Sequence, residues 1–180
     1  PLGYLPTDLP TLEAALAARK LTVVGGSLAA GFGSSADWPA IEQQVHTLGP
    51  LLKGVDAQYL CLIPQNGGGR PMLDAMHRSA KIACERYGLA TVVHAELHSG
   101  VFSEPGIGSF IEASDPGLLD YCLDVGLHAC GGGDPIAFMR THHARIPALH
   151  FTNIDGAVAT RVRSQRVPFD DAVAMGLFQE

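Results

Sequence analysis

The sequence predicts an α/β protein built from parallel βαβ units. Five short apolar runs rich in Val, Leu, Ile and Tyr recur along the 180 residues, and their starts are separated by 36, 33, 29 and 27 residues. Helix-like segments lie between these runs, as the crossover connections of parallel strands require. An open doubly wound sheet and a (β/α)8 barrel both fit this order. The Gly-x-Gly-x-x-Gly fingerprint that would favour a dinucleotide-binding sheet does not follow the first run.

Each element is predicted from its own local pattern. The strands are expected at residues 21–26, 57–64, 90–96, 119–126 and 146–151. Four helices are expected at residues 9–20, 71–88, 134–145 and 169–180. Thr11 can cap the first of these helices, and Gly88 is well placed to end the second. Asp134 and Pro135 open the third, with the proline in the first turn.

The composition bounds the class of protein. With 47% hydrophobic and 17% charged residues the chain can bury one sizeable core, so residues 1–180 are expected to form a single domain. A net charge of -6 disfavours binding to nucleic acid, which normally needs a basic face, and favours a small-molecule partner. No apolar run approaches the ~18 residues of a membrane span, and no signal-peptide pattern opens the chain, so a cytoplasmic protein is expected. The four cysteines form no CxxC pair and are expected to be buried, reduced thiols.

Three predicted strands stay apolar until they end in a residue that can bind a metal. These residues are Glu96, Asp124 and His150. Because the carboxyl ends of parallel strands lie on one face, the three side chains are expected to converge there. Two carboxylates and one imidazole suit Mn²⁺, Mg²⁺, Co²⁺ or Zn²⁺. The competing interpretation is that Glu96 pairs with an arginine, Asp124 caps the following turn and His150 packs in the core.

Other histidines lie near these strand ends. His98 follows Glu96 by two residues, so it is expected on the same side, as a substrate contact or proton shuttle or else as a loop residue. His94 is expected to pack in the barrel interior or to support a ligand. His128 is expected at the start of a loop, either in contact with substrate or solvated.

Two glycine runs and one arginine cluster are weaker signals. Residues 131–133 precede Asp134 like an anion-binding loop before a helix, but Asp134 as a cap would itself take the helix amides. Residues 67–69 are expected to be a flexible loop. The arginines at 161, 163 and 166 could hold an anionic substrate, although a solvated loop face is the usual meaning of such a cluster.

Three long stretches together resemble a known family. They are GYLPTDLPTLEAALAARKLTVVGG, VVHAELHSGVFSE and CLDVGLHACGGGDPIAFMRTHHARIPALHFTN. They are similar to the middle of a xylose isomerase-like TIM barrel of the sugar phosphate isomerase/epimerase superfamily, in its inosose dehydratase-like branch. The resemblance implies a partial (β/α)8 barrel with about five βα units in this chain. It also implies a Glu ligand on a final strand, which these residues do not include.

The resemblance assigns roles to the residues at the strand ends. It implies that Glu96, Asp124 and His150 bind a divalent metal ion. On this basis Glu96 and His98 are expected to be catalytic, and His98 and His128 to contact the substrate. The implied reaction is isomerisation, epimerisation or dehydration of a keto sugar, sugar phosphate or cyclitol through an enediolate-type intermediate. The alternative is a barrel that binds a sugar or metabolite without turnover. The superfamily's endonuclease branch is disfavoured by the acidic charge.

The chain departs from the family pattern at two of these motifs. His128 is displaced by one position from the His of Asp-Thr-Gly-His, and the Lys-Asp expected after His150 is replaced by Thr152 and Asn153. Five strands cannot close an eight-stranded barrel. The open barrel edges are therefore expected to be covered by further chain or by association of subunits into a homo-oligomer.

Overall fold

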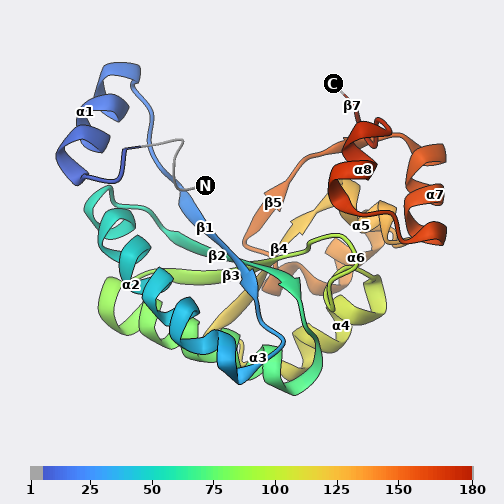
Figure 1. Cartoon of the computed structure of the whole chain (residues 1–180), viewed down its shortest axis with the longest axis horizontal. Coiled ribbons are helices and arrows are strands. Elements are labelled where there is room, and N and C mark those ends of the chain that lie inside the picture. Colours follow the sequence, from blue (N-terminus) through green and yellow to red (C-terminus); the bar gives the residue numbers. More distant parts are fainter. Residues whose placement is uncertain (1–5, 180) are drawn as a thin grey trace.

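The computed structural model describes residues 6–179 and shows one parallel sheet with its strands in sequence order (Figure 1). The strands of this sheet are β1 (Gly25–Gly31), β2 (Tyr59–Asn66), β3 (Ala90–His94), β4 (Leu119–Asp124) and β5 (Ala148–His150). Every neighbouring pair is parallel. A doubly wound sheet would reverse its strand order at a switch point, whereas this order never reverses. The structure thus decides between the two predicted architectures in favour of an open part of a barrel.

The helices and the remaining short elements complete the chain. The helices are α1 (Leu9–Arg19), α2 (Trp38–Gly54), α3 (Gly69–Ile82), α4 (Glu104–Ala113), α5 (Val125–Cys130), α6 (Pro135–His142), α7 (Gly156–Gln165) and α8 (Phe169–Ala174). Short turns lie at η1 (Ser35–Asp37), η2 (Ala83–Tyr87, π-helical) and η3 (His143–Arg145), and β6 (Asn153–Ile154) pairs antiparallel with β7 (Phe178–Gln179). Among the described residues no helix combines the length and the apolar character needed to cross a membrane.

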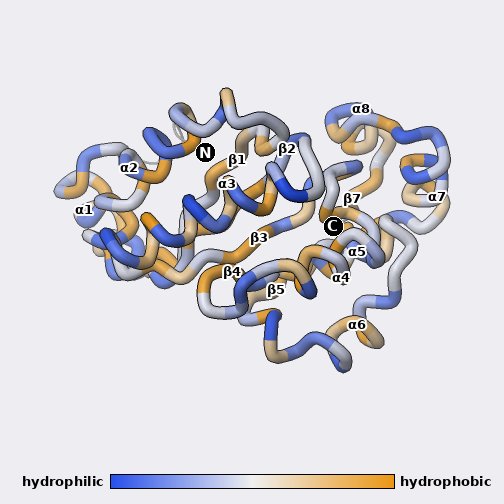
Figure 2. Tube along the Cα trace, turned by 90° about the horizontal axis from the view of Figure 1, so that it is seen from below, coloured by the Kyte–Doolittle hydropathy of each residue, from blue (hydrophilic) through white to orange (hydrophobic). Residues whose placement is uncertain are grey.

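The helices α2, α3 and α4 lie together along one side of the sheet (Figure 1). The side chains of β2 alternate, so that Leu60 and Leu62 are buried beneath these helices while Tyr59 and Cys61 are only partly buried. Hydrophobic and hydrophilic segments also alternate along α2 and α3 (Figure 2), as expected for helices that cover a sheet on one face only. The main core therefore lies between the sheet and these helices.

The opposite face of the sheet is hollow. A cavity of about 300 Å³ is lined by residues of all five strands, including Cys61 on β2, Val92 on β3, Cys122 on β4 and His150 on β5. In a closed barrel this inner face is filled by layers of side chains. The sheet therefore has a helix-covered outer face and an open inner face that reaches His150.

A second hydrophobic cluster lies beside the main one. It joins the segment that follows β3, through Leu97 and Phe102, to α5, α7 and α8, through Leu127, Val162 and Ala172. This cluster packs the last third of the chain against the carboxyl ends of β3 and β4.

Several predicted elements differ from the observed ones. The first strand begins at Gly25 rather than at residue 21, and Leu21 and Val24 are 58% and 64% exposed. The strand begins at Gly25 because pairing with β2 begins there, opposite Tyr59. The two backbones lie so close that a Cβ on Gly25 would be 2.7 Å from the Tyr59 carbonyl oxygen. The cap of α1 is Asp8, whose carboxylate accepts a hydrogen bond from the Thr11 backbone N–H at 3.0 Å.

Two segments expected to be loops are helical. Asp124 and Asp155 accept hydrogen bonds from the first backbone N–H groups of α5 and α7, which is the usual way to start a helix. His128 consequently lies within α5 and not in a loop. Arg161 and Arg163 lie on α7, and the Arg163 guanidinium donates to the Cys130 carbonyl oxygen at 3.1 Å.

The thiols on the inner face are held in their protonated form. Burial raises the pKa of Cys61 to about 12 and that of Cys122 to about 11. At pH 8 about one in 10⁴ of the first thiols and one in 10³ of the second are therefore ionised, and only the thiolate is nucleophilic. Burial also raises the pKa of Cys130, whereas Cys84 is exposed.

We expect iodoacetamide at pH 8 to alkylate Cys84 well before the other three cysteines. Peptide mapping by mass spectrometry over time measures the order, and Cys84→Ser should remove the fast phase. Labelling of Cys61 and Cys122 should accelerate as the pH rises toward 11, since ionisation limits it. Equally fast labelling of Cys61 at pH 8 would contradict the assignment of protonated, shielded thiols.

Candidate metal centre

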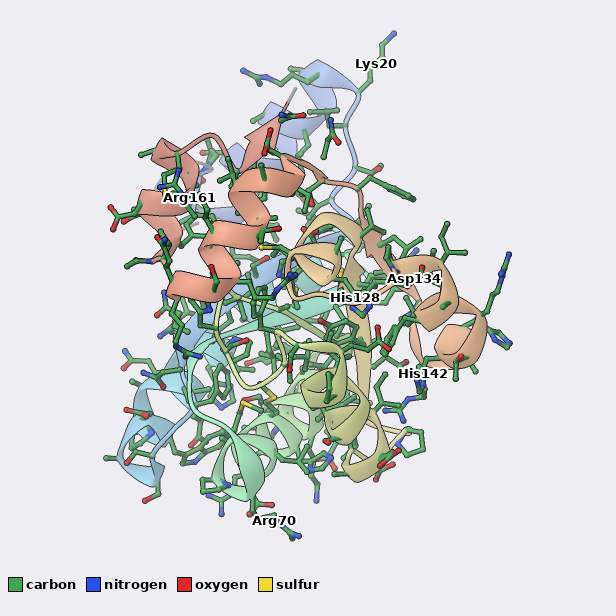
Figure 3. All side chains as sticks on the ribbon, turned by 90° about the vertical axis from the view of Figure 1, so that its right-hand side faces the viewer. Lys20, Arg70, His128, Asp134, His142 and Arg161 are labelled. Carbon is green, nitrogen blue, oxygen red and sulfur yellow. The ribbon has the colours of Figure 1, made fainter. Side chains whose placement is uncertain are left out.

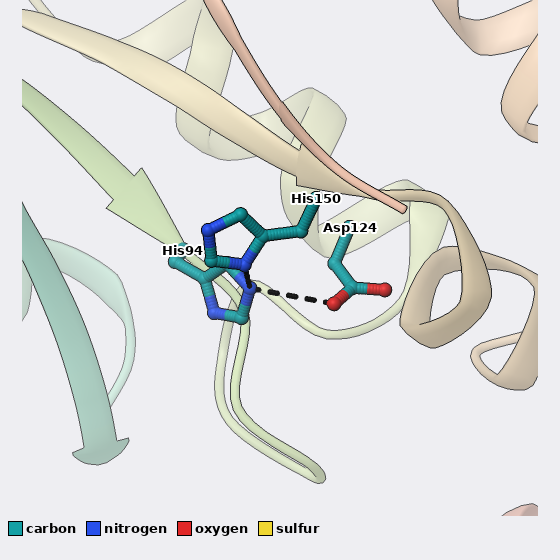
Figure 4. A group of neighbouring side chains, drawn as sticks. All are labelled: His94, Asp124 and His150. Atoms are coloured by element: carbon teal, nitrogen blue, oxygen red, sulfur yellow. Dashed lines mark hydrogen bonds and ion pairs between the residues drawn. The ribbon is translucent and has the colours of Figure 1, made fainter. Parts of the chain in front are cut away.

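Three polar side chains meet at the carboxyl ends of adjacent strands. His94 is the last residue of β3, Asp124 the last of β4 and His150 the last of β5. One ligand atom from each lies within 4.8 Å of the other two. Figure 4 shows the two imidazole rings and the carboxylate turned toward one another. Of the three side chains predicted to converge, Asp124 and His150 lie together, and His94 completes the group in place of Glu96.

The distances within the group are short. His94 Nε2 lies 3.0 Å from His150 Nδ1 and 3.6 Å from Asp124 Oδ2, and the two ring centroids are 4.6 Å apart. Ligand atoms held tetrahedrally about 2.0–2.2 Å from Zn²⁺ would be about 3.3–3.6 Å apart. These two distances are close to that range, and all three ligand atoms lie within 4.8 Å of one another, so side-chain rotations would suffice to bring them around one small divalent cation.

The two carboxylate oxygens of Asp124 have different partners. Its Oδ1 accepts hydrogen bonds from the Leu127 backbone N–H at 2.8 Å and from the Thr152 hydroxyl, which leaves Oδ2 facing the imidazoles. The competing interpretation of Asp124 as a cap is correct for one oxygen only. A single side chain here both begins α5 and faces the site.

The local environment keeps these groups in the forms that bind metals. Burial acts to raise the pKa of Asp124, but the hydrogen bonds from His94, Leu127 and Thr152 outweigh it, so the net shift is downward. Burial of the ring, together with the charge that His94 can carry, lowers the pKa of His150 below its usual range. At neutral pH the group thus holds an ionised carboxylate and a neutral His150 imidazole, which are the forms that bind a cation.

Glu96 does not belong to this group. The chain leaves the sheet after His94 and turns, with the Ser99 backbone N–H donating to the Glu96 carbonyl oxygen at 3.1 Å. The Glu96 carboxylate is half-buried, and its Oε1 accepts the Leu97 backbone N–H at 3.0 Å. The structure thus puts His94 at the position for which the sequence predicted Glu96. A metal-binding or catalytic role of Glu96 stays a prediction.

His98 connects two distant parts of the chain. Its backbone adopts a left-handed conformation with φ of 64°, and its Nε2 donates to the Val167 carbonyl oxygen at 2.9 Å. Its ring also meets the edge of Phe102 at 5.4 Å between centroids. This geometry anchors the linker between α7 and α8 to the turn after β3. The predicted substrate contact through His98 is not tested by these distances.

His128 is buried beside α4 and α6. Only 2% of it is exposed, its Nε2 lies 3.1 Å from Glu104 Oε2, and its ring packs on Phe138 at 4.8 Å between centroids. Figure 3 shows it on the same side of the molecule as Asp134 and His142. Burial lowers its pKa despite the nearby Glu104. These contacts hold α5 to its neighbours, and the substrate contact expected of His128 stays a prediction.

The glycines before α6 serve close packing. A Cβ on Gly133 would overlap the His128 ring, and one on Gly131 would lie 2.6 Å from the Phe102 carbonyl oxygen. Asp134 Oδ1 accepts the backbone N–H groups of Ile136 and Ala137 at 2.9 and 3.1 Å. As the sequence predicted, the cap occupies the amides that an anion would need.

Comparisons with known proteins bear on the family and on the fold. No family model matches the chain. Over 107 residues, which are 59% of this chain and 34% of the relative, it is 30% identical to an inosose dehydratase of Geobacillus kaustophilus. The chain spans about a third of the length of the curated relatives it matches.

Solved structures share the fold. A sugar phosphate isomerase/epimerase from Parabacteroides distasonis superposes with a TM-score of 0.63 at 13% identity, over 89% of this chain and 63% of the other. The IOLI protein, solved with a binding zinc atom, superposes with a TM-score of 0.59 at 12% identity, over 81% and 60% of the two chains. The predicted resemblance is therefore confirmed: this chain is similar in sequence to inosose dehydratases and has the fold of sugar phosphate isomerase/epimerase TIM barrels.

Proposed function

We propose that the chain carries the metal centre of an enzyme that isomerises, epimerises or dehydrates a keto sugar, sugar phosphate or cyclitol. The observation that carries this proposal is the group of His94, Asp124 and His150, brought together at the carboxyl ends of three adjacent barrel strands. That end of a barrel is where such folds keep their active sites. The sequence similarity to inosose dehydratases supports the same class of reaction.

The donor set favours a divalent cation with open coordination positions. Two imidazoles and one carboxylate suit Zn²⁺, Mn²⁺ or Co²⁺, and Mg²⁺ is the weakest of the predicted candidates because it prefers oxygen ligands. Three protein ligands leave at least one position for substrate or water, which is typical of catalytic rather than structural sites. The zinc atom in the structurally similar IOLI protein supports the choice of cation.

Two neighbouring features bear on catalysis. The hollow of about 300 Å³ on the inner face of the sheet meets the group at His150, although neither His94 nor Asp124 lines it. A bound divalent ion would polarise a carbonyl or hydroxyl group of the substrate and ease removal of a neighbouring proton. Glu96, with Oε1 engaged by Leu97, keeps Oε2 for proton transfer, and His98 lies on the same turn.

The sheet has two open edges. Within the described residues β1 pairs only with β2, and β5 pairs only with β4. We propose that these edges are covered by further barrel strands or by a second copy of the chain, since an exposed edge strand invites aggregation.

Metal analysis and proton exchange together test the proposed function. Purified protein loaded with Zn²⁺, Mn²⁺ or Co²⁺ and then desalted should retain about one ion per chain by elemental analysis, and His94→Ala and His150→Ala should retain far less. Incubation with inososes and keto sugars in D₂O should then exchange a carbon-bound proton, which NMR detects whichever of the three reactions follows.

Three outcomes separate the possibilities. Retention of metal with exchange supports the enzyme. Retention of metal and tight polyol binding without exchange favours the alternative of a non-catalytic binding barrel. Equal metal content in the wild type and both His→Ala variants would show that the centre is misassigned.

A further inference from the structure

Asp124 and His150 are tied together by a residue outside the metal-binding group. Thr152 follows His150 by two residues, and its hydroxyl donates a hydrogen bond to Asp124 Oδ1. Because a carboxylate is the acceptor, this bond is charge-assisted and stronger than one between neutral groups. It links the segment after β5 to the end of β4, and so joins two of the three strand ends that form the centre.

The hydrogen bond from Thr152 to Asp124 matters because few other contacts fix the position of β5. The strand has only three residues, lies at the edge of the sheet, and pairs with β4 through Cys122, Leu123 and Asp124 alone. Leu149 and Phe151, on either side of His150, are 37% and 80% exposed, so little packing fixes this segment. Beside the backbone pairing of His150 with Asp124, the Thr152 hydroxyl therefore adds a side-chain constraint on where His150 lies.

The lack of a side chain at Gly126 on α5 leaves room for this contact. A Cβ on Gly126 would overlap Thr152 Oγ1 and lie 2.7 Å from the Thr152 carbonyl oxygen and 3.0 Å from Ile154 Cγ2. Gly126 is buried in the first turn of α5, directly after Val125. Only glycine at this position lets Thr152 approach the Asp124 carboxylate.

We propose that Thr152 is a positioning residue for the metal centre: its hydroxyl fixes the rotation of the Asp124 carboxylate, so that Oδ2 faces the imidazoles, and holds His150 beside it. The inference rests on the proposed function, since it assigns a role in forming that same centre. It concerns the affinity for the ion rather than a step of the reaction. Partners that orient a metal ligand from outside the group typically contribute 10–100-fold to metal affinity.

Four variants of the full chain test the role of the hydroxyl. Thr152→Val keeps the shape and removes the hydroxyl, and we expect it to bind Zn²⁺ about 10–100-fold more weakly by competition with a chromophoric chelator. Thr152→Ser keeps the hydroxyl and should stay within about threefold of the wild type. Gly126→Ala should weaken Zn²⁺ binding like Thr152→Val. Thr160→Val is the matched control, because its hydroxyl on the exposed face of α7 binds only the Gly156 carbonyl oxygen, at 2.9 Å.

The outcomes separate this inference from the proposed function. If the wild type binds no Zn²⁺, the proposed function fails first. If the wild type binds and Thr152→Val binds equally well, the positioning role is wrong while the centre stands. Equal losses in Thr152→Val and Thr152→Ser would overturn it as well, since the hydroxyl that serine retains would then fail to preserve the affinity for Zn²⁺. Thermal unfolding without metal checks that each variant is folded.

Discussion

Replacing Asp124 with asparagine is expected to weaken Zn²⁺ and Mn²⁺ binding by more than about 100-fold, beyond the 10–100-fold that outer partners contribute. The substitution removes the only carboxylate of the three-residue group. Asparagine caps helices about as well as aspartate, so α5 should keep its first turn. Competition with a chromophoric chelator gives the affinity, and circular dichroism reports the fold.

Glu96→Gln is the informative control for this prediction. Because Glu96 lies outside the group, this variant should bind the ion with an affinity close to that of the wild type, even if it loses activity. A large loss of metal in Glu96→Gln with little change in Asp124→Asn would restore the ligand set predicted from the sequence. It would also show that the turn after β3 rearranges when the ion binds.

Replacing Arg145 with methionine is expected to lower the free energy of unfolding by about 3 kcal/mol, the low end for a broken buried ion pair, because Asp120 is 34% exposed. The guanidinium donates to Asp120 Oδ1 at 2.9 Å, to Ser114 Oγ at 2.8 Å, and to the carbonyl oxygens of Ile111 and Leu119 at 3.0 and 2.5 Å. Methionine keeps the apolar stem but leaves these acceptors unpaired at the end of α4 and the start of β4. Urea denaturation followed by circular dichroism measures the change.

Arg70→Met is the matched control for this stability test. Arg70 pairs with Asp74 at 2.8 Å, but the two side chains are 83% and 47% exposed. An exposed pair of this kind on a helix contributes about 0.3–0.5 kcal/mol. Similar small effects of both substitutions would show that the Arg145 network does not stabilise the lower end of the barrel.

The sequence was most informative where an apolar run ends in a polar residue. Asp124 and His150 are predicted because each is a metal-competent side chain at the carboxyl end of its run, and both lie in the observed group. His94 follows the same rule after Val92 and Val93, and this signal could have identified it. The sequence favours Glu96 because His94 lies deeper along the predicted strand, where a packing or supporting role is expected. The two residues share one face of an extended chain, so alternation alone cannot decide between them. The end of strand pairing at His94 decides it, and that depends on β4.

The differences in the fold arise from long-range contacts. The glycine-rich β1 has low intrinsic strand propensity and forms because β2 offers a pairing partner, which the local pattern cannot reveal. The helices α5 and α7 are short. Asp124, which begins α5, is predicted as a metal ligand, and no pattern identified in the sequence predicts α7. The sequence does not decide between a barrel and a doubly wound sheet, because the local spacing of strands and helices is the same in both.

One consequence concerns the short edge strand that carries His150. A segment with three paired residues and exposed neighbours opens locally at a low free-energy cost, long before the whole molecule unfolds. An ion that binds only the closed arrangement would slow amide hydrogen exchange there by a factor of one plus the ratio of the free ion concentration to its Kd. The segment around β5 would then be most rigid when the ion is bound.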